Sequence, residues 1–172
     1  MHEIAVIGTA GRGNTAVLTS ESLFGAIVAK AEDIVTNEWE FDWGQVHLIS
    51  GGAAWTDHAA IRLFLAHPSA KLTLHFPCQF IVGPKPQFED LGSTDWRKNS
   101  GQMANQYHKQ FSSVINSNSM LEILEAIEAG AVVATDSRGF HDCNTKIALA
   151  QRMIAFTWSK GISPEKGGTL DT

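Results

Sequence analysis

Residues 4–13 read IAVIGTAGRG, a short apolar run that stops at a glycine-rich loop. Consecutive apolar residues rich in β-branched side chains are typical of a buried strand, and clustered glycines are typical of a turn or loop. The same succession recurs at residues 46–66, where VHLIS is followed by two glycines and then by apolar residues at helical spacing. A strand, a glycine turn and a helix thus succeed one another twice.

The rest of the chain continues this alternation. The pattern predicts strands at 4–7, 46–50, 71–76, 131–134 and 153–158, and helices at 23–35, 55–66, 101–115, 119–129 and 145–151. Alternating strands and helices imply right-handed crossovers and a mostly parallel sheet with helices on both faces. We therefore expect an α/β fold, a three-layer Rossmann-like domain with about five or more strands.

Segment 77–100 interrupts the alternation, because it is polar, proline-bearing and without clear periodicity. A loop of this length in a compact domain is usually functional. We expect one domain over residues 1–172, with an insertion or lid at about 77–118.

Composition limits the classes of partner. The 172 residues are 44% hydrophobic, enough for one core, and the formal net charge of −5 argues against a nucleic-acid backbone as the main partner. Cys78 and Cys143 stand far apart without CxxC spacing, which favours reduced thiols over a zinc site or a disulfide framework. No apolar run reaches the roughly 18 residues of a membrane helix. These features predict a soluble, cytoplasmic protein that does not enter membranes.

The first glycine-rich loop is a candidate phosphate cradle. Ligands of parallel α/β sheets sit outside the carboxyl ends of the strands, and Gly8 and Gly11 leave backbone amides there with little steric cover. Thr9 and Arg12 can add a hydroxyl and a guanidinium to a bound phosphate. The loop is not a Walker motif and matches GxGxxG poorly, so glycines that only make a tight turn are the alternative.

The second loop, SGGAAWTD at residues 50–57, opens a helix at a strand end, where the helix dipole favours an anion. Ser50, Gly51 and Gly52 are candidate ligand-binding residues. Asp57 is expected in the first turn. It either caps the helix or complements its dipole, or it serves as a carboxylate that hydrogen-bonds a ribose or holds a water.

A third glycine pair repeats this design after the last strand. Gly167, Gly168 and Thr169 are candidate binding residues, and Asp171 follows as a second candidate catalytic carboxylate. The alternative is a glycine-bearing tail without a ligand.

Three further residues join the candidate site. Asn144 and Lys146 follow the fourth predicted strand at the same edge and can meet a base or a phosphate, although Lys146 also suits a solvated face. Trp96 lies in the long polar segment, where its ring either stacks on a base or fills the core.

Other chemistry finds little support in the sequence. His141, Asp142 and Cys143 are chain neighbours, which rarely chelate one ion together, so we expect no metal. There is no GxSxG elbow and no HExxH, and no motif calls for a bound cofactor.

Taken together, GTAGR after the first strand, SGGAAWTDHAA after the second, the later RGFHDCNTKIALAQRMIAFTW and the closing GGTLDT resemble the SLOG superfamily. This Rossmann-like group includes the DNA-processing protein DprA and the cytokinin-activating LOG enzymes. The resemblance covers nearly the whole chain and implies binding of nucleotides or nucleotide-derived signals. The residues that match its motifs are Gly8, Thr9, Gly11, Arg12, Gly51, Gly52, Asp57, Asn144, Gly167, Gly168 and Thr169.

The LOG branch also implies cleavage of an N-glycosidic bond, but its loop reads PGGxGTxxE, whereas here it reads KGGTLDT with Asp171 two residues beyond Thr169. The main hypothesis is therefore a sensor or sequestering protein for a nucleotide-derived ligand. The alternative is an N-glycosidic hydrolase of a nucleoside monophosphate or NAD-like substrate, in which Asp57 or Asp171 steers water and Arg12 holds phosphate. A structural protein with a degenerate pocket is a third hypothesis. By analogy with related folds we expect a homodimer or higher homo-oligomer.

Overall fold

The computed structural model describes residues 1–8, 19–95, 97–134 and 139–158. Within them the helices are α1 (Glu21–Asp33), α2 (His58–Ala66), α3 (Ser100–Val114), α4 (Ser119–Glu128) and α5 (Gly139–Ile147). The strands are β1 (His2–Gly8), β2 (Val46–Ser50), β3 (Lys71–His75), β4 (Phe80–Ile81), β5 (Gln87–Phe88), β6 (Val132–Ala134) and β7 (Arg152–Phe156). A π-helical turn (Ile34–Glu38) extends α1, and 3₁₀ turns η3 (Trp43–Gln45) and η4 (Trp55–Asp57) precede β2 and α2.

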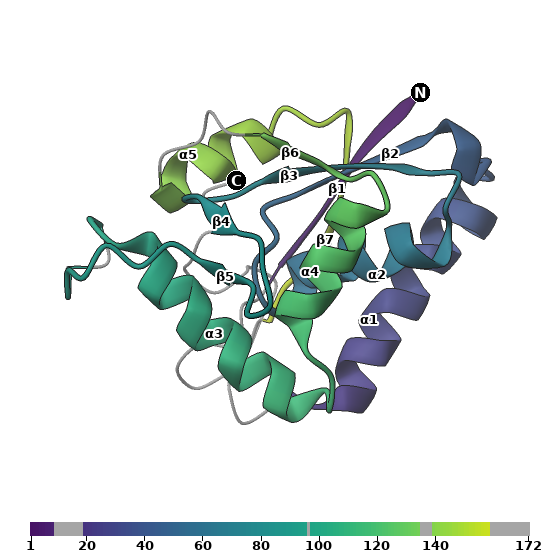
Figure 1. The fold of residues 1–172 in the computed structure, drawn as a ribbon. Coiled ribbons are helices and arrows are strands. Elements are labelled where there is room, and N and C mark those ends of the chain that lie inside the picture. Colours follow the sequence, from purple (N-terminus) through teal and green to yellow (C-terminus); the bar gives the residue numbers. More distant parts are fainter. Residues whose placement is uncertain (9–18, 96, 135–138, 159–172) are drawn as a thin grey trace.

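The main sheet has five parallel strands in the order β6-β3-β2-β1-β7 (Figure 1). Every neighbouring pair in it is parallel, and register runs from Ile4 opposite Leu48 to Ser50 opposite Leu74. Each parallel connection carries a helix, as the crossover rule requires. The prediction of an α/β, Rossmann-like fold is confirmed.

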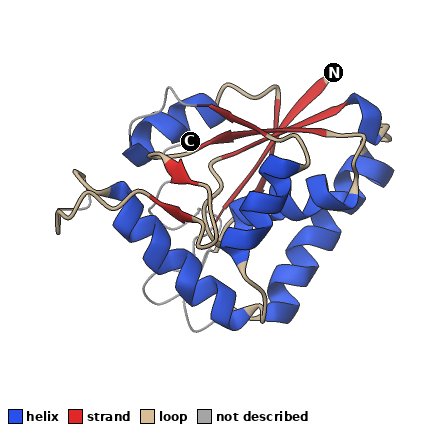
Figure 2. Cartoon of the chain, viewed as in Figure 1, coloured by secondary structure: helices blue, strands red, loops and turns tan. Residues whose placement is uncertain are grey.

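Helices cover both faces of this sheet, and β1 shows why. Its side chains alternate, so that Ile4 and Val6 join the large core under α1, α2 and α4, while Ala5 and Ile7 face α5 on the other side. Figure 2 shows the strands between the two helical layers. The domain is therefore three layers deep.

The caps of the helices explain where they begin. The Ser20 hydroxyl accepts the Leu23 N–H at 3.1 Å at the start of α1, and the Asn118 side chain accepts from the first turn of α4. The helix α4 ends at Glu128, and the φ of +105° at Gly130 lets the N–H of Ala131 reach back to the Ala126 carbonyl at 2.9 Å.

Segment 77–100 is more regular than expected. The prediction of an irregular loop is wrong at β4 and β5, which pair antiparallel as a small hairpin. Phe80 and Phe88 face each other across it and are buried in the large core, so tertiary packing supplies what local propensity does not. The reading of 77–118 as a lid stays a prediction.

The helix expected at residues 145–151 is also wrong in position, because α5 occupies Gly139–Ile147. Cys143 and Ile147 lie four residues apart and are buried against the sheet, which fixes the inward face of the helix. Turns then lead directly into β7, which begins one residue earlier than predicted and ends at Phe156.

No helix in the described part of the chain is both long and apolar enough to cross a bilayer.

Gly25 and Gly130 differ in backbone conformation, and substitution by alanine tests this difference. A Cβ would meet nothing within 4 Å at either Gly25, inside α1, or Gly130, but only Gly130 has a positive φ. We expect Gly25→Ala to raise the free energy of unfolding by about 0.5–1 kcal/mol, because alanine loses less conformational entropy on folding. We expect Gly130→Ala to lower it by about 1–2 kcal/mol, because an L-residue is strained in that conformation. Urea unfolding at 25 °C measures both, and shifts of the same sign would contradict this account.

Candidate functional site

Gly8 ends strand β1, which lies between β2 and β7 at the point where the sheet reverses its order. The chain runs from β1 to β2 on one side, whereas β7 pairs on the other side, and such switch points are where parallel α/β sheets bind ligands. A Cβ at Gly8 would stand 2.1 Å from the carbonyl oxygen of Phe156 and 2.8 Å from Cγ2 of Thr56. Glycine therefore lets β1, β7 and the turn η4 meet at the carboxyl edge.

Ser50 closes the loop that follows the neighbouring strand β2. Its side chain is fully buried, and its hydroxyl donates to the Asp57 carbonyl at 2.9 Å while accepting the Gly52 N–H at 3.0 Å. One hydroxyl thus ties both ends of the loop. We call residues 50–57 the GG loop; its backbone is held by these bonds within the folded chain.

Two residues of the GG loop have left-handed backbone. Gly52 has φ +62°, and a Cβ there would stand 2.4 Å from Cε1 of the Phe76 ring. Trp55 has φ +69°, which strains a bulky residue, but its ring is buried 4.9 Å from the ring of Phe111. Burial of the indole offsets the strain at Trp55, whereas the space at Gly52 admits only glycine.

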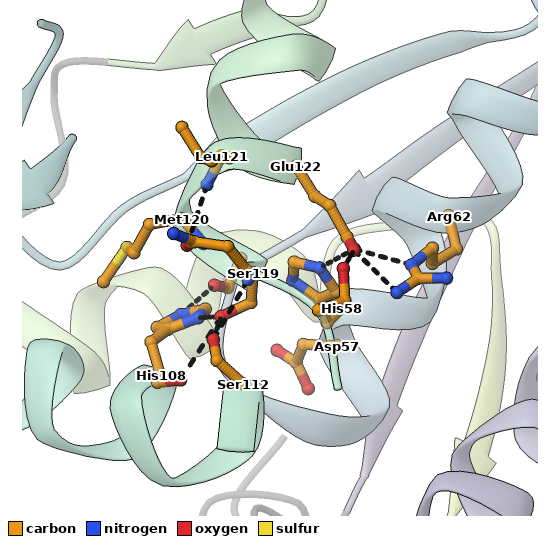
Figure 3. Close-up of polar contacts among 12 residues, drawn as sticks. Asp57, His58, Arg62, His108, Ser112, Ser119, Met120, Leu121 and Glu122 are labelled. Carbon is orange, nitrogen blue, oxygen red and sulfur yellow. Dashed lines mark hydrogen bonds and ion pairs between the residues drawn. The ribbon is translucent and has the colours of Figure 1, made fainter. Parts of the chain in front are cut away.

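Asp57 makes no side-chain capping bond to α2, but it is an acidic residue in the first turn of η4, where its charge complements the helix dipole. Its Oδ2 atom lies 3.2 Å from the position a Cβ of Gly51 would take, and the Ile147 side chain of α5 lies 3.1 Å from the same position. Gly51 therefore leaves room in which the Asp57 carboxylate and α5 come together. Figure 3 shows that this carboxylate points away from the neighbouring Arg62–Glu122 pair.

The helix α5 brings two more predicted residues toward this edge. Asn144 and Lys146 lie within α5, both half-buried, one turn or less from the Ile147 that approaches Gly51. The Lys146 ammonium lies 3.4 Å from the Asp142 carboxylate one turn before it. The structure thus brings Gly8, the GG loop and α5 to one edge.

The remaining predicted site residues lie outside the described part of the chain. These are Thr9, Gly11, Arg12, Trp96, Gly167, Gly168, Thr169 and Asp171. Their roles stay predictions.

His108 of α3 contacts the GG loop directly. It is 1% exposed, its Nε2 atom lies 3.0 Å from the Gly52 carbonyl oxygen and its Nδ1 atom lies 2.9 Å from the Ser119 hydroxyl (Figure 3). Burial, together with the nearby His58, lowers the pKa of His108 to about 3. The imidazole is therefore neutral at pH 7.

A second cluster joins α2 to α4 beside this loop. Glu122 accepts from His58 Nε2 at 2.8 Å and from Arg62 Nε and Nη2 at 2.6 Å, and Ser117 also donates to it. Burial alone would raise the pKa of Glu122, but the hydrogen bonds from His58, Ser117 and Arg62 lower it to about 2. Burial lowers the pKa of His58, and the hydrogen bond and negative charge of Glu122 offset part of this shift. Its Nδ1 atom has no hydrogen-bond partner among the described residues.

Sequence reasoning missed both histidines. His108 sits 56 residues from Gly52 and His58 sits 64 residues from Glu122, so no local spacing reveals either pair. His108 stands in a run of polar residues that is typical of a helix surface, and only the tertiary fold buries it.

Comparisons with known proteins identify a viral relative of this chain. No family model matches the chain, and no solved structure matches it. The "Uncharacterized protein R261" of Acanthamoeba polyphaga mimivirus is 34% identical over 171 residues, which cover 98% of this chain and 87% of that protein. The chain belongs to the family of this viral protein. The likeness extends over β1, the GG loop, the insertion and α5, because it spans nearly the whole chain.

The GG loop can be tested with a pair of glycines. Gly52 and Gly92 both have positive φ, but a Cβ at Gly92 meets nothing within 4 Å. We expect Gly92→Ala to lower the free energy of unfolding by about 1–2 kcal/mol through backbone strain. Gly52→Ala is expected to cost about 1–3 kcal/mol more, because the methyl group collides with Phe76. Equal losses by urea unfolding would show that Phe76 does not press on the loop.

The burial of His108 predicts a pH dependence. Its pKa is about 3 in the folded chain against about 6.5 when unfolded, so the unfolded state binds one more proton between these values. The contribution to stability is complete above pH 6.5 and is lost as the pH falls, at up to about 1.4 kcal/mol per pH unit. We expect His108→Gln to remove the contribution of His108 to this slope. His58 is present in both proteins, so its own contribution cancels in the comparison. Parallel pH profiles of urea unfolding from pH 7.5 to 4.5 would contradict a buried, neutral His108.

Proposed function

We propose that this protein binds a nucleotide or a nucleotide-derived ligand at the carboxyl edge of its sheet and acts as a sensor or sequestering protein. The observation that carries the proposal is the convergence of Gly8, Gly51 and the Asp57 carboxylate at the switch point of a parallel sheet. Backbone amides at the start of the η4–α2 unit suit a phosphate, and a carboxylate suits ribose hydroxyls.

The motif resemblance supports the same ligand class. We propose membership of the SLOG superfamily on the strength of the GG loop and the loop that begins at Gly8, with Thr9 and Arg12 as phosphate contacts. In this proposal the protein is cytoplasmic and homodimeric. Its net charge of −5 leaves small molecules better candidates than nucleic acid.

A second candidate function is hydrolysis of an N-glycosidic bond. Its support is that the half-buried Asp57 carboxylate lies beside Gly51 at the carboxyl edge of the sheet, so it suits a carboxylate that steers water toward an anomeric carbon. Asp171 is the alternative carboxylate.

One experiment tests the two candidates together. The purified chain, its mass measured by light scattering, is incubated with nucleoside monophosphates, NAD, ADP-ribose and cyclic dinucleotides. Thermal shift reports binding and chromatography reports products. We expect stabilisation by at least one nucleotide that is recovered intact. Release of free base that disappears in Asp57→Asn or Asp171→Asn would favour the hydrolase instead.

The matched control is Asp33→Asn, which removes a carboxylate on α1 that pairs with Lys30 and belongs to no proposed site. It should leave product release unchanged. No shift with any ligand of the panel would contradict nucleotide binding.

A further inference from the structure

The hydrogen bonds around His108 decide which of its two ring nitrogens carries the proton. The Gly52 carbonyl oxygen only accepts, so Nε2 of His108 carries the proton and Nδ1 accepts. The Ser119 hydroxyl lies 2.9 Å from Nδ1, closer than the 3.4 Å to its other acceptor, the His108 carbonyl oxygen, and therefore donates to Nδ1. The Ser112 hydroxyl donates to the Ser119 oxygen and accepts the Ser119 N–H at 3.0 Å. The network therefore fixes one tautomer of the imidazole and one direction of its N–H, toward the GG loop.

This bond orients the next peptide group. The described chain has no cis peptide bond, and in a trans peptide the C=O and the following N–H point in opposite directions. Because the Gly52 carbonyl points at α3, the N–H of Ala53 points away from α3. Gly52 alone would hold this peptide plane weakly, since glycine accepts many backbone angles.

Ala53 is also where the GG loop reaches solvent. Residues 50–52 and 54–56 are all buried, whereas Ala53 and Asp57 are half-buried. Ala53, whose N–H points away from α3, and Asp57 are therefore the residues of this loop that a ligand can approach. Donor and acceptor together fit a molecule with a phosphate and sugar hydroxyls.

We propose that His108 is a positioning residue for the ligand, which turns the Gly52–Ala53 peptide so that the Ala53 N–H donates to a phosphate oxygen of a bound nucleoside phosphate. This inference rests on the proposed function and assigns a role to a residue of the insertion. His108 does not touch the ligand itself; it acts through the peptide.

The test compares AMP with adenosine, which lacks the phosphate, by titration calorimetry. His108→Phe keeps an aromatic ring but removes the donor, and His108→Gln restores an amide N–H. We expect His108→Phe to weaken AMP binding at least tenfold while adenosine affinity changes less than twofold, and His108→Gln to recover most of the AMP affinity. The neighbouring Gln110→Ala, exposed on the same helix, is the control and should bind both as the unaltered chain does.

Other results overturn the inference in distinguishable ways. Equal weakening of AMP and adenosine would show that His108 only supports the pocket, and unchanged AMP binding in His108→Phe would show that the peptide does not need it. Absence of binding of either compound to the unaltered chain would overturn the proposed function, and the inference with it. If His108→Phe does not fold, Ser119→Ala takes its place, because it removes the hydroxyl that fixes the tautomer without changing the ring. It should weaken AMP binding selectively, and unchanged AMP affinity there overturns the inference.

Discussion

The contact between the Phe76 ring and Gly52 is the constraint on which the site depends. Phe76 is 2% exposed and is held on its other sides by Phe80 and Phe88 at ring distances of 5.5 and 5.1 Å. The ring therefore has little freedom to retreat, and the backbone beside it must have no side chain and a positive φ. Position 52 accordingly turns left-handed, and that turn presents its carbonyl to α3. The hairpin β4–β5, although short, shapes the GG loop through this one ring.

His108 and Glu122, two buried polar residues next to this contact, offset the free-energy cost of their burial in different ways. His108 stays neutral, and the Gly52 carbonyl and the Ser119 hydroxyl bond both of its ring nitrogens, so no charge leaves water. Glu122 is ionised and compensated by Arg62, whose side chain is 37% exposed and keeps part of its charge hydrated. The first arrangement orients a loop and the second fastens α2 to α4. Removing a single partner destabilises either arrangement, because a buried polar group without a hydrogen-bond partner costs free energy.

The sequence predicted what local patterns encode. Residues 4–7 and 46–50 form strands that are followed by glycine. This pattern made the fold and the placement of Gly8 and Gly51 at one edge accessible. The hairpin at 80–88 was not, because two-residue strands have no periodicity and their pairing depends on aromatic contacts with Phe76. The role of His108 was hidden for the same reason: its partners come from two distant elements, and its own surroundings in the sequence are polar.

These contacts also bear on the insertion. Swinging residues 77–118 away from the sheet would break the bond between His108 and Gly52 and expose Phe88 and Phe111, which are at most 1% exposed. Exposing two such rings costs about 3–6 kcal/mol at the usual value for a buried aromatic side chain. A state that costly is populated at less than about 1%. In the described state these contacts hold the insertion against the sheet, and the bond from α3 to the Gly52 carbonyl holds the GG loop in place.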